Sequence, residues 1–225
     1  MPNHCSNSVT ITGPNDTIKE IASRLKEDTD GNLQFDFEQF LPMPVELKGI
    51  VASYPPAKVF TKDTGVQVYE EDLGLYKDSD GKTYNREECE YRNLTDEECE
   101  NLRKEFGAVH WYEWYNKTIG TKWGYYEQTV EVREGSISIS AQSAWCPASS
   151  GLIAFSKLYP DVVIQNAFSE PGAGFLGLEE IAKGDVETLH SYEGNFYEDS
   201  DDEEYEDEGH YVEEVEKFLD EHSLN

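Results

Sequence analysis

Along several stretches of the chain, apolar and polar residues alternate with the period of two that is typical of half-buried strands. Residues 3–12 alternate in this way and stop at Gly13, and residues 33–40 repeat the pattern with leucine and phenylalanine at the apolar positions. Between them, the apolar residues of 15–28 recur at helical spacing. The pattern therefore predicts that the chain opens as a β-α-β unit with short connections.

The same patterns return in the second half of the chain. Residues 136–140 alternate serine with isoleucine, which is the clearest strand signal. All four tryptophans lie in the block 110–151, and this aromatic density predicts the main core. A helix follows, and we expect Leu152, Phe155 and Leu158 to form its buried face. The predicted elements are a short helix ending near Gly120, strands at 126–132 and 136–140, a helix at 147–158, and strands at 161–168 and 175–182.

Residues 45–106 interrupt this order. They carry 15 acidic and 9 basic residues with few aliphatic ones, and they predict an inserted subdomain with a short strand at 66–69. Thr95 and Glu98 form a capping box at the start of a helix predicted over 96–106. The whole order predicts an α+β fold over residues 1–185, a ferredoxin-like split β-α-β sandwich with an antiparallel sheet and helices on one face. Residues 186–225 are then an acidic tail with a C-terminal amphipathic helix.

The net charge of −29 is the most unusual property of the chain. It argues against direct binding of nucleic acid, which depends on neutralising phosphates with Lys and Arg. An acidic surface can instead occupy a basic, nucleic-acid-binding groove on another protein. Residues 185–225 carry 17 acidic residues against one basic residue. We predict that an acidic strip in this segment binds a partner; the alternative is a solvated linker to a docked helix. The strip consists of Glu198, Asp199, Asp201, Asp202, Glu203, Glu204, Glu206, Asp207 and Glu208.

Motifs of enzyme chemistry do not occur in the sequence: it has no P-loop, no G-x-S-x-G, no H-E-x-x-H, and its five histidines are isolated. We therefore expect no catalytic residues, no metal and no cofactor. One candidate ligand site remains, because a scarce lysine beside a tryptophan can hold an anion. Alternatively, Gly120 only turns the chain, Lys122 pairs with a carboxylate and Trp123 packs. The candidate ligand site consists of Asn116, Lys117, Lys122, Trp123, Cys146 and Glu170.

Several blocks of the sequence resemble the YubB-like, ferredoxin-fold family of phage and conjugative-plasmid proteins. The most specific are Gly-Thr-Lys-Trp at 120–123 and Ala-Trp-Cys-Pro at 144–147, and the resemblance covers residues 1–45 and 107–185. It implies the ferredoxin-like fold and an origin in a mobile element, but no activity. Because accessory genes of phages and plasmids often act against host defences, it also favours a role of that kind.

The chain has no apolar run of the roughly 18 residues that a membrane span requires. Its N-terminal residues lack the features of a secretory signal, so we expect a location in the cytoplasm of the bacterial host. Our leading hypothesis is a non-enzymatic protein that binds and inhibits a host defence protein through an acidic surface that imitates nucleic acid. The first alternative is a small-ligand-binding protein, sequestering or enzymatic, with its site around the loop 117–123. The second is a dimerising structural protein.

Overall fold

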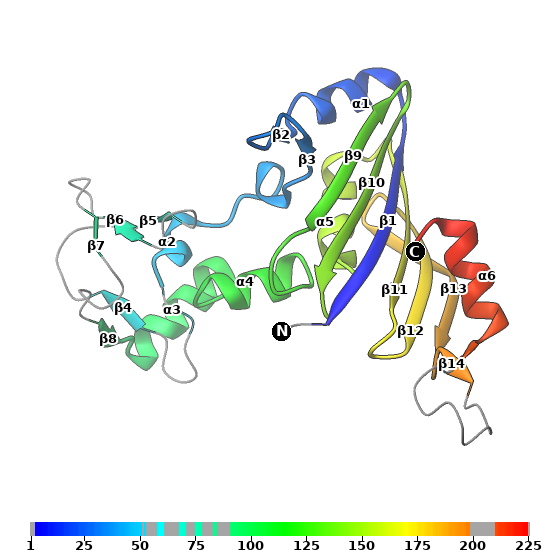
Figure 1. The fold of residues 1–225 in the computed structure, drawn as a ribbon. Helices are drawn as coiled ribbons and strands as arrows, with labels where there is room; N and C mark the ends of the chain where they lie inside the picture. Colours follow the sequence, from blue (N-terminus) through cyan, green and yellow to red (C-terminus); the bar gives the residue numbers. More distant parts are fainter. Residues whose placement is uncertain are drawn as a thin grey trace. The chain divides into compact units, whose positions relative to one another are not determined.

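A computed structural model of the protein describes residues 3–50, 52, 58–60, 68–70, 75–77, 83–84, 91–198 and 210–224 (Figure 1). The chain divides into two compact units. The first consists of residues 1–41 and 118–225, and the second of residues 42–117. The second unit is close in extent to the predicted insertion, and the two are described separately below.

The first unit is built on a six-stranded sheet in which all neighbouring strands are antiparallel. Its strand order is β13-β12-β11-β1-β10-β9, so that the first strand of the chain lies inside the sheet between β11 and β10. Alternation explains the placement of β1, since Cys5, Val9 and Ile11 are buried while their neighbours in sequence are not. The strands are β1 (His4–Thr12), β9 (Tyr126–Arg133), β10 (Ser136–Ala144), β11 (Val163–Glu170), β12 (Phe175–Ala182) and β13 (Asp185–Glu193).

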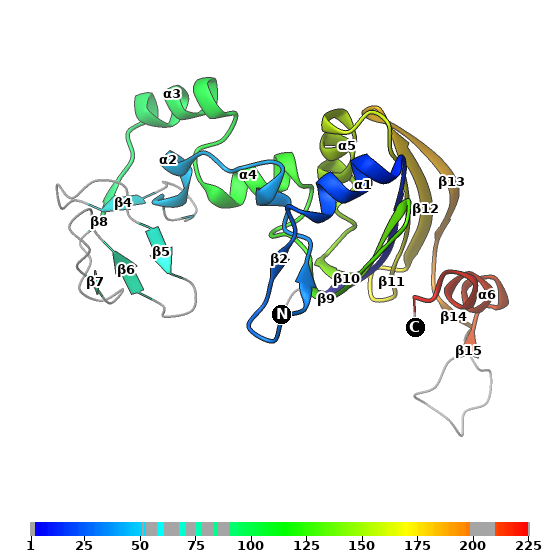
Figure 2. The same ribbon diagram turned by 90° about the horizontal axis from the view of Figure 1, so that it is seen from above.

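The connections of this sheet are those of a ferredoxin-like fold. The strands β1 and β9 are joined through α1 (Asn15–Ala22) and flank β10, which is a split β-α-β arrangement. The helix α5 (Ser149–Leu158) joins β10 to β11, on the other side of β1. Both helices lie on one face of the sheet (Figure 2). The predicted α+β, ferredoxin-like class is confirmed.

The strand predicted over residues 33–40 is wrong beyond its first two residues. Only β3 (Leu33–Gln34) is extended, paired with β2 (Lys26–Glu27), and a 3₁₀ helix follows at Phe37–Gln39. The Asp36 side chain accepts a hydrogen bond from the backbone N–H of Glu38 and so starts that helix. The phenylalanines of this stretch are buried all the same, because they enter the core from an irregular segment. The alternation of these phenylalanines thus indicates buried positions but not a strand. The second strand of the split β-α-β unit is β9.

Three further expectations differ in detail. The helix α1 ends at Ala22, earlier than predicted, because the chain becomes extended at β2. Leu158 lies at the last position of α5 and is 49% exposed, not buried. Of the four tryptophans only Trp114 is buried, and Trp145 is 51% exposed, so the aromatic block is core only in part.

The sheet and a further helix continue into the segment that the sequence analysis assigned to the tail. The strand β13 adds an edge to the sheet beside β12, and a two-stranded ladder follows, formed by β14 (Tyr197–Glu198) and β15 (His210–Tyr211). The chain then forms α6 (Glu213–His222), the predicted amphipathic helix. This helix lies on the sheet face opposite α1 and α5 (Figure 2).

The second unit contains short strands and three helices within its described residues. The helix predicted over 96–106 is confirmed with its capping box, and Gly107 ends it in the left-handed conformation at φ 76°. Of the strand predicted at 66–69, residues 68 and 69 belong to β5 (Val68–Glu70), and residues 66 and 67 lie outside the described residues. The elements are α2 (Val45–Lys48), β4 (Lys58–Phe60), β5 (Val68–Glu70), β6 (Leu75–Lys77), β7 (Thr83–Tyr84), β8 (Tyr91–Asn93), α3 (Asp96–Phe106) and α4 (Trp111–Thr118).

Candidate functional site

An apolar cluster fixes α6 on the open face of the sheet. Val215, Phe218 and Leu219 of the helix are buried, at the positions that the helical spacing predicts. They pack with residues of the sheet and of the segment that leaves it, together with the C-terminal Leu224. Two buried residues of the sheet, Ala167 on β11 and Leu176 on β12, belong to this cluster. The helix is therefore docked on the sheet. Members of the cluster besides the helix are Ala167, Leu176, Phe196 and Leu224.

The outer surface of α6 is acidic. Its first turn holds Glu213, Glu214 and Glu216, where carboxylates stabilise the helix N-terminus. All three side chains belong to exposed residues. Lys217, the one lysine of the helix, forms an ion pair with Glu221 at an Nζ–Oε1 distance of 3.9 Å. Opposite the helix lies His190 on β13, whose Nε2 is 3.6 Å from Oε1 of Glu214. The docked helix thus presents a surface with an excess of negative charge.

The acidic strip begins and ends at one strand pair. Tyr197 and Tyr211 are cross-strand partners in β14 and β15, their ring centroids are 4.6 Å apart, and one hydroxyl donates to the other at 3.0 Å. This hydrogen bond raises the pKa of Tyr211. In addition, the backbone N–H of Val212 donates to the carbonyl of Phe196 at 2.7 Å. The two flanks of the strip are therefore held together and attached to the cluster that anchors α6.

The strip itself, from Asp199 to Glu208, lies outside the described residues, and Glu198 is described by its backbone in β14 alone. The carboxylates of the described residues that accompany it are those of α6 and β13. Glu193 is exposed and is the last residue of β13. Four residues later the chain enters β14, where the acidic strip begins. We use the name acidic C-terminal face for α6 and the end of β13 together with the acidic strip, which lies between them in the sequence.

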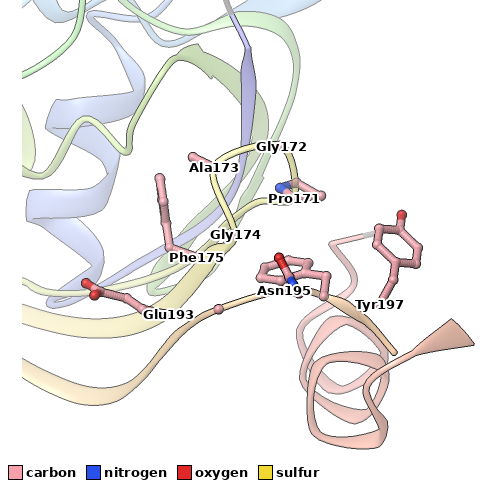
Figure 3. Close-up of a pocket in the computed structure, with 10 residues that line it drawn as sticks. Pro171, Gly172, Ala173, Gly174, Phe175, Glu193, Asn195 and Tyr197 are labelled. Atoms are coloured by element: carbon pink, nitrogen blue, oxygen red, sulfur yellow. The ribbon is translucent and has the colours of Figure 1, made fainter. Parts of the chain in front are cut away.

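A pocket of about 740 Å³ opens beside this face. Its lining comes from the β11–β12 turn at 171–174, from Phe175, and from residues 193–197. Figure 3 shows the turn on one side, Asn195 and Tyr197 on the other, and Glu193 near Phe175 at one end. Phe175 and Glu193 are direct cross-strand partners in β12 and β13. Glu193 supplies the only ionisable carboxylate of the lining, which contains no basic residue.

Glu170 has a structural role at the rim of this pocket. Its side chain is 3% exposed and accepts hydrogen bonds from the backbone N–H groups of Gly172, at 3.1 Å, and Ala173. The carboxylate thus caps the turn that joins β11 to β12. Gly172 lies so close that an added Cβ would come within 3.0 Å of the Glu170 carboxylate. Glu170, which the sequence placed in the candidate ligand site, therefore has its carboxylate hydrogen-bonded to the backbone of the turn.

The other members of the candidate ligand site are separated between the two units. In the second unit, Lys117 binds Glu113 at 2.8 Å and the carbonyl of Gly107 at 2.8 Å, and Asn116 donates to the carbonyl of Tyr112. In the first unit, Lys122 lies over the Trp123 ring, with Nζ 4.4 Å from its centroid. The structure thus places a cation–π pair where the sequence suggested an anion-binding loop.

Cys146 connects that loop to a buried polar cluster beneath α5. Its thiol is 3.1 Å from the carbonyl of Gly120, and its own carbonyl accepts a hydrogen bond from Ser143. Ser143 also accepts from Asn7, at 2.9 Å, across the β1–β10 ladder. Burial raises the pKa of the Cys146 thiol. The cysteine is consequently a protonated packing residue at the edge of the cluster.

The buried polar cluster is completed by residues that the sequence analysis did not select. Asn166 and Glu179 are cross-strand partners in β11 and β12, and Glu179 accepts a 2.7 Å hydrogen bond from Ser149 at the start of α5. Burial raises the pKa of Glu179, while Ser149 and the nearby Asn166 oppose this shift. Asn166 is fully buried, yet neither its amide nitrogen nor its oxygen reaches hydrogen-bond geometry.

Further polar atoms of this region are buried without a partner, among them the Asn7 amide oxygen and the Tyr125 hydroxyl. Burial raises the pKa of Tyr125, with smaller contributions from Cys5 and Glu179. Buried polar groups are normally hydrogen-bonded, so such atoms indicate bound water or a small polar ligand. The sequence signal was available: asparagine at inward positions of β1 and β11, where alternation predicts apolar residues.

Neither a metal site nor a membrane-spanning helix is found in the part of the chain that the structure describes. No group of three or more His, Cys, Asp or Glu residues is arranged to hold a metal ion there. Among the same residues, no helix combines the length and apolar character that crossing a membrane requires.

Comparison with known proteins bears on the second half of the chain. No curated protein matches it. The crystal structure of protein api92 from Yersinia pseudotuberculosis has a TM-score of 0.40 and 12% sequence identity to it, over 87% of this chain and 99% of that chain. The family model described as the ferredoxin-like domain in Api92-like protein matches residues 122–212, which run from the Lys122 loop through β9–β13 to the start of α6. Residues 122–212 are thus similar to the ferredoxin-like domain of Api92-like proteins.

Proposed function

We propose that the protein is a binding protein whose acidic C-terminal face occupies a basic surface of another protein. The observation that carries this proposal is the anchoring of the acidic segment. The helix α6 is docked through Val215, Phe218 and Leu219, and the two flanks of the acidic strip are paired at Tyr197 and Tyr211. A charged run that is fixed at both ends loses less conformational entropy on binding than a free tail would.

Electrostatics favour a strongly basic partner. The net charge of −29 gives the protein a negative field that accelerates encounter with a positive surface. The largest positive grooves on proteins are those that bind nucleic acid, because these neutralise a dense row of phosphates. We propose that the acidic C-terminal face imitates nucleic acid in such a groove and thereby inhibits the partner.

The biological setting follows from the resemblance of blocks 120–123 and 144–147 to proteins of phages and conjugative plasmids. In this proposal the protein is encoded by a mobile element, acts in the cytoplasm of a bacterial host and inhibits a defence protein. Its origin and its target are supported by association, whereas the acidic surface is supported by charge and structure.

The proposal is tested with two variants of equal charge change. In the first, Asp201, Asp202, Glu203 and Glu204 of the strip are replaced by Asn or Gln. In the control, the exposed residues Glu20, Glu97, Glu100 and Glu105 are replaced by Gln.

Both variants are compared with the wild type in pull-downs from host lysate at about 0.05 and 0.5 M salt, the latter a strongly screening concentration. We expect the wild type and the control to retain a partner at low salt and the strip variant to lose it. Retention of the same partner by the strip variant at both salt concentrations would refute the proposal.

A second candidate function is favoured by the unpaired atoms of the buried polar cluster, and it is the binding of a small polar ligand. The site would join Lys122, Trp123 and Cys146 to the cluster beneath α5. Native mass spectrometry of the protein purified from its host is the direct measurement, because a bound ligand adds a discrete mass. We expect this mass to disappear when Lys122 and Trp123 are replaced by Ala with unchanged circular dichroism, and an apo mass in the wild type would remove this candidate.

A further inference from the structure

A serine and a glutamate form a hydrogen-bonded pair at the start of α5. The Ser149 hydroxyl donates to a carboxylate oxygen of Glu179 at 2.7 Å, and both residues are half-buried, so that a small molecule from solvent can reach them. Burial raises the pKa of Glu179, which makes its carboxylate a stronger base than that of an exposed glutamate. A serine hydroxyl bonded to such a base is the arrangement of an activated nucleophile.

Asn166 lies beside this pair in the sheet. It is the direct cross-strand partner of Glu179, and it is fully buried with neither amide atom in hydrogen-bond geometry. The amide is near enough to Glu179 to lower the pKa of its carboxyl, against the larger effect of burial. A catalytic base is commonly oriented by a third polar group. Asn166 is placed to orient the Glu179 carboxylate in this way.

The start of α5 supplies a hydrogen-bond donor next to the hydroxyl. Ser149 is the first residue of the helix, and no side chain caps the helix. The N–H of Gly151 donates to the carbonyl of Ile119 at 2.9 Å, whereas the N–H of Ser150 has no acceptor among the described residues. In acyl transfer by a serine at a helix N-terminus, the N–H of the residue after the serine stabilises the developing oxyanion.

Two aromatic rings lie beside the pair on the same face of the sheet. Because side chains alternate along β12, Phe175 and Gly177 share the face of Glu179. Phe168 on β11 is the cross-strand partner of Gly177, and its ring lies over this glycine, where an added Cβ would be 2.5 Å from the ring. The centroids of the Phe168 and Phe175 rings are 6.1 Å apart, and both residues are half-buried. The rings thus offer an apolar surface next to the carboxylate.

We propose that Ser149 and Glu179 hydrolyse a small carboxylic ester with an apolar acyl group. The Ser149 Oγ attacks the carbonyl carbon while its proton passes to Glu179, and the N–H of Ser150 donates to the carbonyl oxygen as it becomes negative. The bond to the alcohol oxygen then breaks, and this oxygen takes the proton from Glu179. Water next attacks the acyl-serine and gives a proton to Glu179. The carboxylic acid leaves, and the proton returns to Ser149.

The inference goes beyond both functions proposed above. It shares the buried polar cluster with the second candidate function, but it needs no ligand that stays bound, and it does not involve the acidic C-terminal face. The net charge of −29 favours an uncharged substrate, because it repels anions. Ser149 and Glu179 are 30 residues apart in the sequence, which explains why no local motif of enzyme chemistry indicates them.

The experiment uses the full chain and p-nitrophenyl butyrate, an uncharged ester with an apolar acyl group. The key variants are Ser149→Ala and Glu179→Gln, and circular dichroism checks that each is folded. Their controls are Ser140→Ala, at an exposed serine of β10, and Glu180→Gln, which removes the same charge on the other face of β12. A second probe is diisopropyl fluorophosphate, which phosphorylates a nucleophilic serine with loss of fluoride, and peptide mass spectrometry identifies the modified residue.

We expect Ser149→Ala and Glu179→Gln each to lower kcat/KM about 100-fold, while both controls keep the wild-type value. The fluorophosphate should modify Ser149 of the wild type. Equal hydrolysis by Ser149→Ala and the wild type, or no modification of Ser149, would overturn the proposal. Either result leaves the acidic C-terminal face untouched, because loss of partner binding by the strip variant is its separate test.

The pH profile tests the base and its positioning residue. Glu179 acts when it is ionised, and burial raises its pKa, so kcat/KM should rise with pH through a midpoint above the ordinary glutamate value of 4.5. Because Asn166 opposes this shift, Asn166→Ala should move the midpoint to higher pH. A wild-type profile with no midpoint above 4.5 would exclude Glu179 as the base, and an unchanged midpoint in Asn166→Ala would exclude the positioning role.

Discussion

A single glutamate organises the start of α3. The Glu98 carboxylate accepts hydrogen bonds from the Thr95 backbone N–H at 2.8 Å and from both terminal nitrogens of Arg92, at 2.8 and 2.6 Å. These bonds, first those from Arg92 and then that from Thr95, lower the pKa of Glu98 to about 2. The sequence predicted the capping box from residue spacing, but the arginine comes from the preceding strand, which no local pattern relates to the helix.

The pH dependence follows from the direction of that shift. Because the pKa of the folded state is depressed, the stabilisation is present above the ordinary glutamate value of 4.5 and is lost as the pH falls toward about 2. An NMR titration of the side-chain carboxyl should show Glu98 still ionised near pH 3.5, when exposed glutamates are largely protonated. In Arg92→Met the midpoint should rise toward 4.5. A midpoint near 4.5 in the wild type would contradict the observed contacts.

The buried polar cluster marks the limit of prediction at the residue scale. Asn7 and Asn166 are buried at inward positions of their strands, but a pattern of apolar and polar positions contains no information on which polar groups meet. Glu179 and Ser149 illustrate this, since their hydrogen bond joins β12 to the start of α5 across 30 residues of sequence. Glu170, named as a member of the candidate ligand site, caps the turn that follows it.

At the element scale, α6 was predictable and the segment 33–40 was not. The stripe Val215, Phe218 and Leu219 has one helical interpretation, because strand alternation would place Val215 and Phe218 on opposite faces. For 33–40 the alternating phenylalanines fit a strand, yet the backbone N–H of Phe35 donates to the Gln128 side chain at 2.8 Å and to no neighbouring strand. Hydrogen bonds between distant segments therefore decided the structure there.

Docking of α6 is testable by removing its central ring. Phe218 is stacked between His190 and His222, with centroid distances of 5.3 and 4.4 Å, and it belongs to the apolar cluster. Replacing it with Ala should cost about 3–5 kcal/mol of docking energy and release the helix. Hydrogen exchange should then accelerate over α6 while β1 and β10 stay protected. The exposed Glu216→Ala on the same helix is the control, and unchanged protection of α6 in Phe218→Ala would show that the cluster does not anchor it.

At the scale of the whole molecule, an acidic segment is joined to a ferredoxin-like sheet without being part of its topology. The order β11-β1-β10-β9 with α1 and α5 could be anticipated from the order of elements along the chain. The exception is the second strand of the first β-α-β unit, which was predicted at 33–40 and is β9. The addition of β13 could not, because its residues are almost all exposed and show little alternation. For the described acidic residues, the structure gives the positions on β13 and α6, and it pairs β14 with β15, the strands between which the acidic strip runs in the sequence.

The central claim is that the acidic C-terminal face makes the contact with a basic partner. Its most direct test is the association rate of the captured partner, measured by stopped flow as a function of salt for the wild type, the strip variant and the control variant of equal charge change. Electrostatic steering predicts that neutralising the strip slows association about tenfold at low salt and flattens the salt dependence, while the control stays close to the wild type. Equal rates and equal salt dependence for the two variants would contradict the claim.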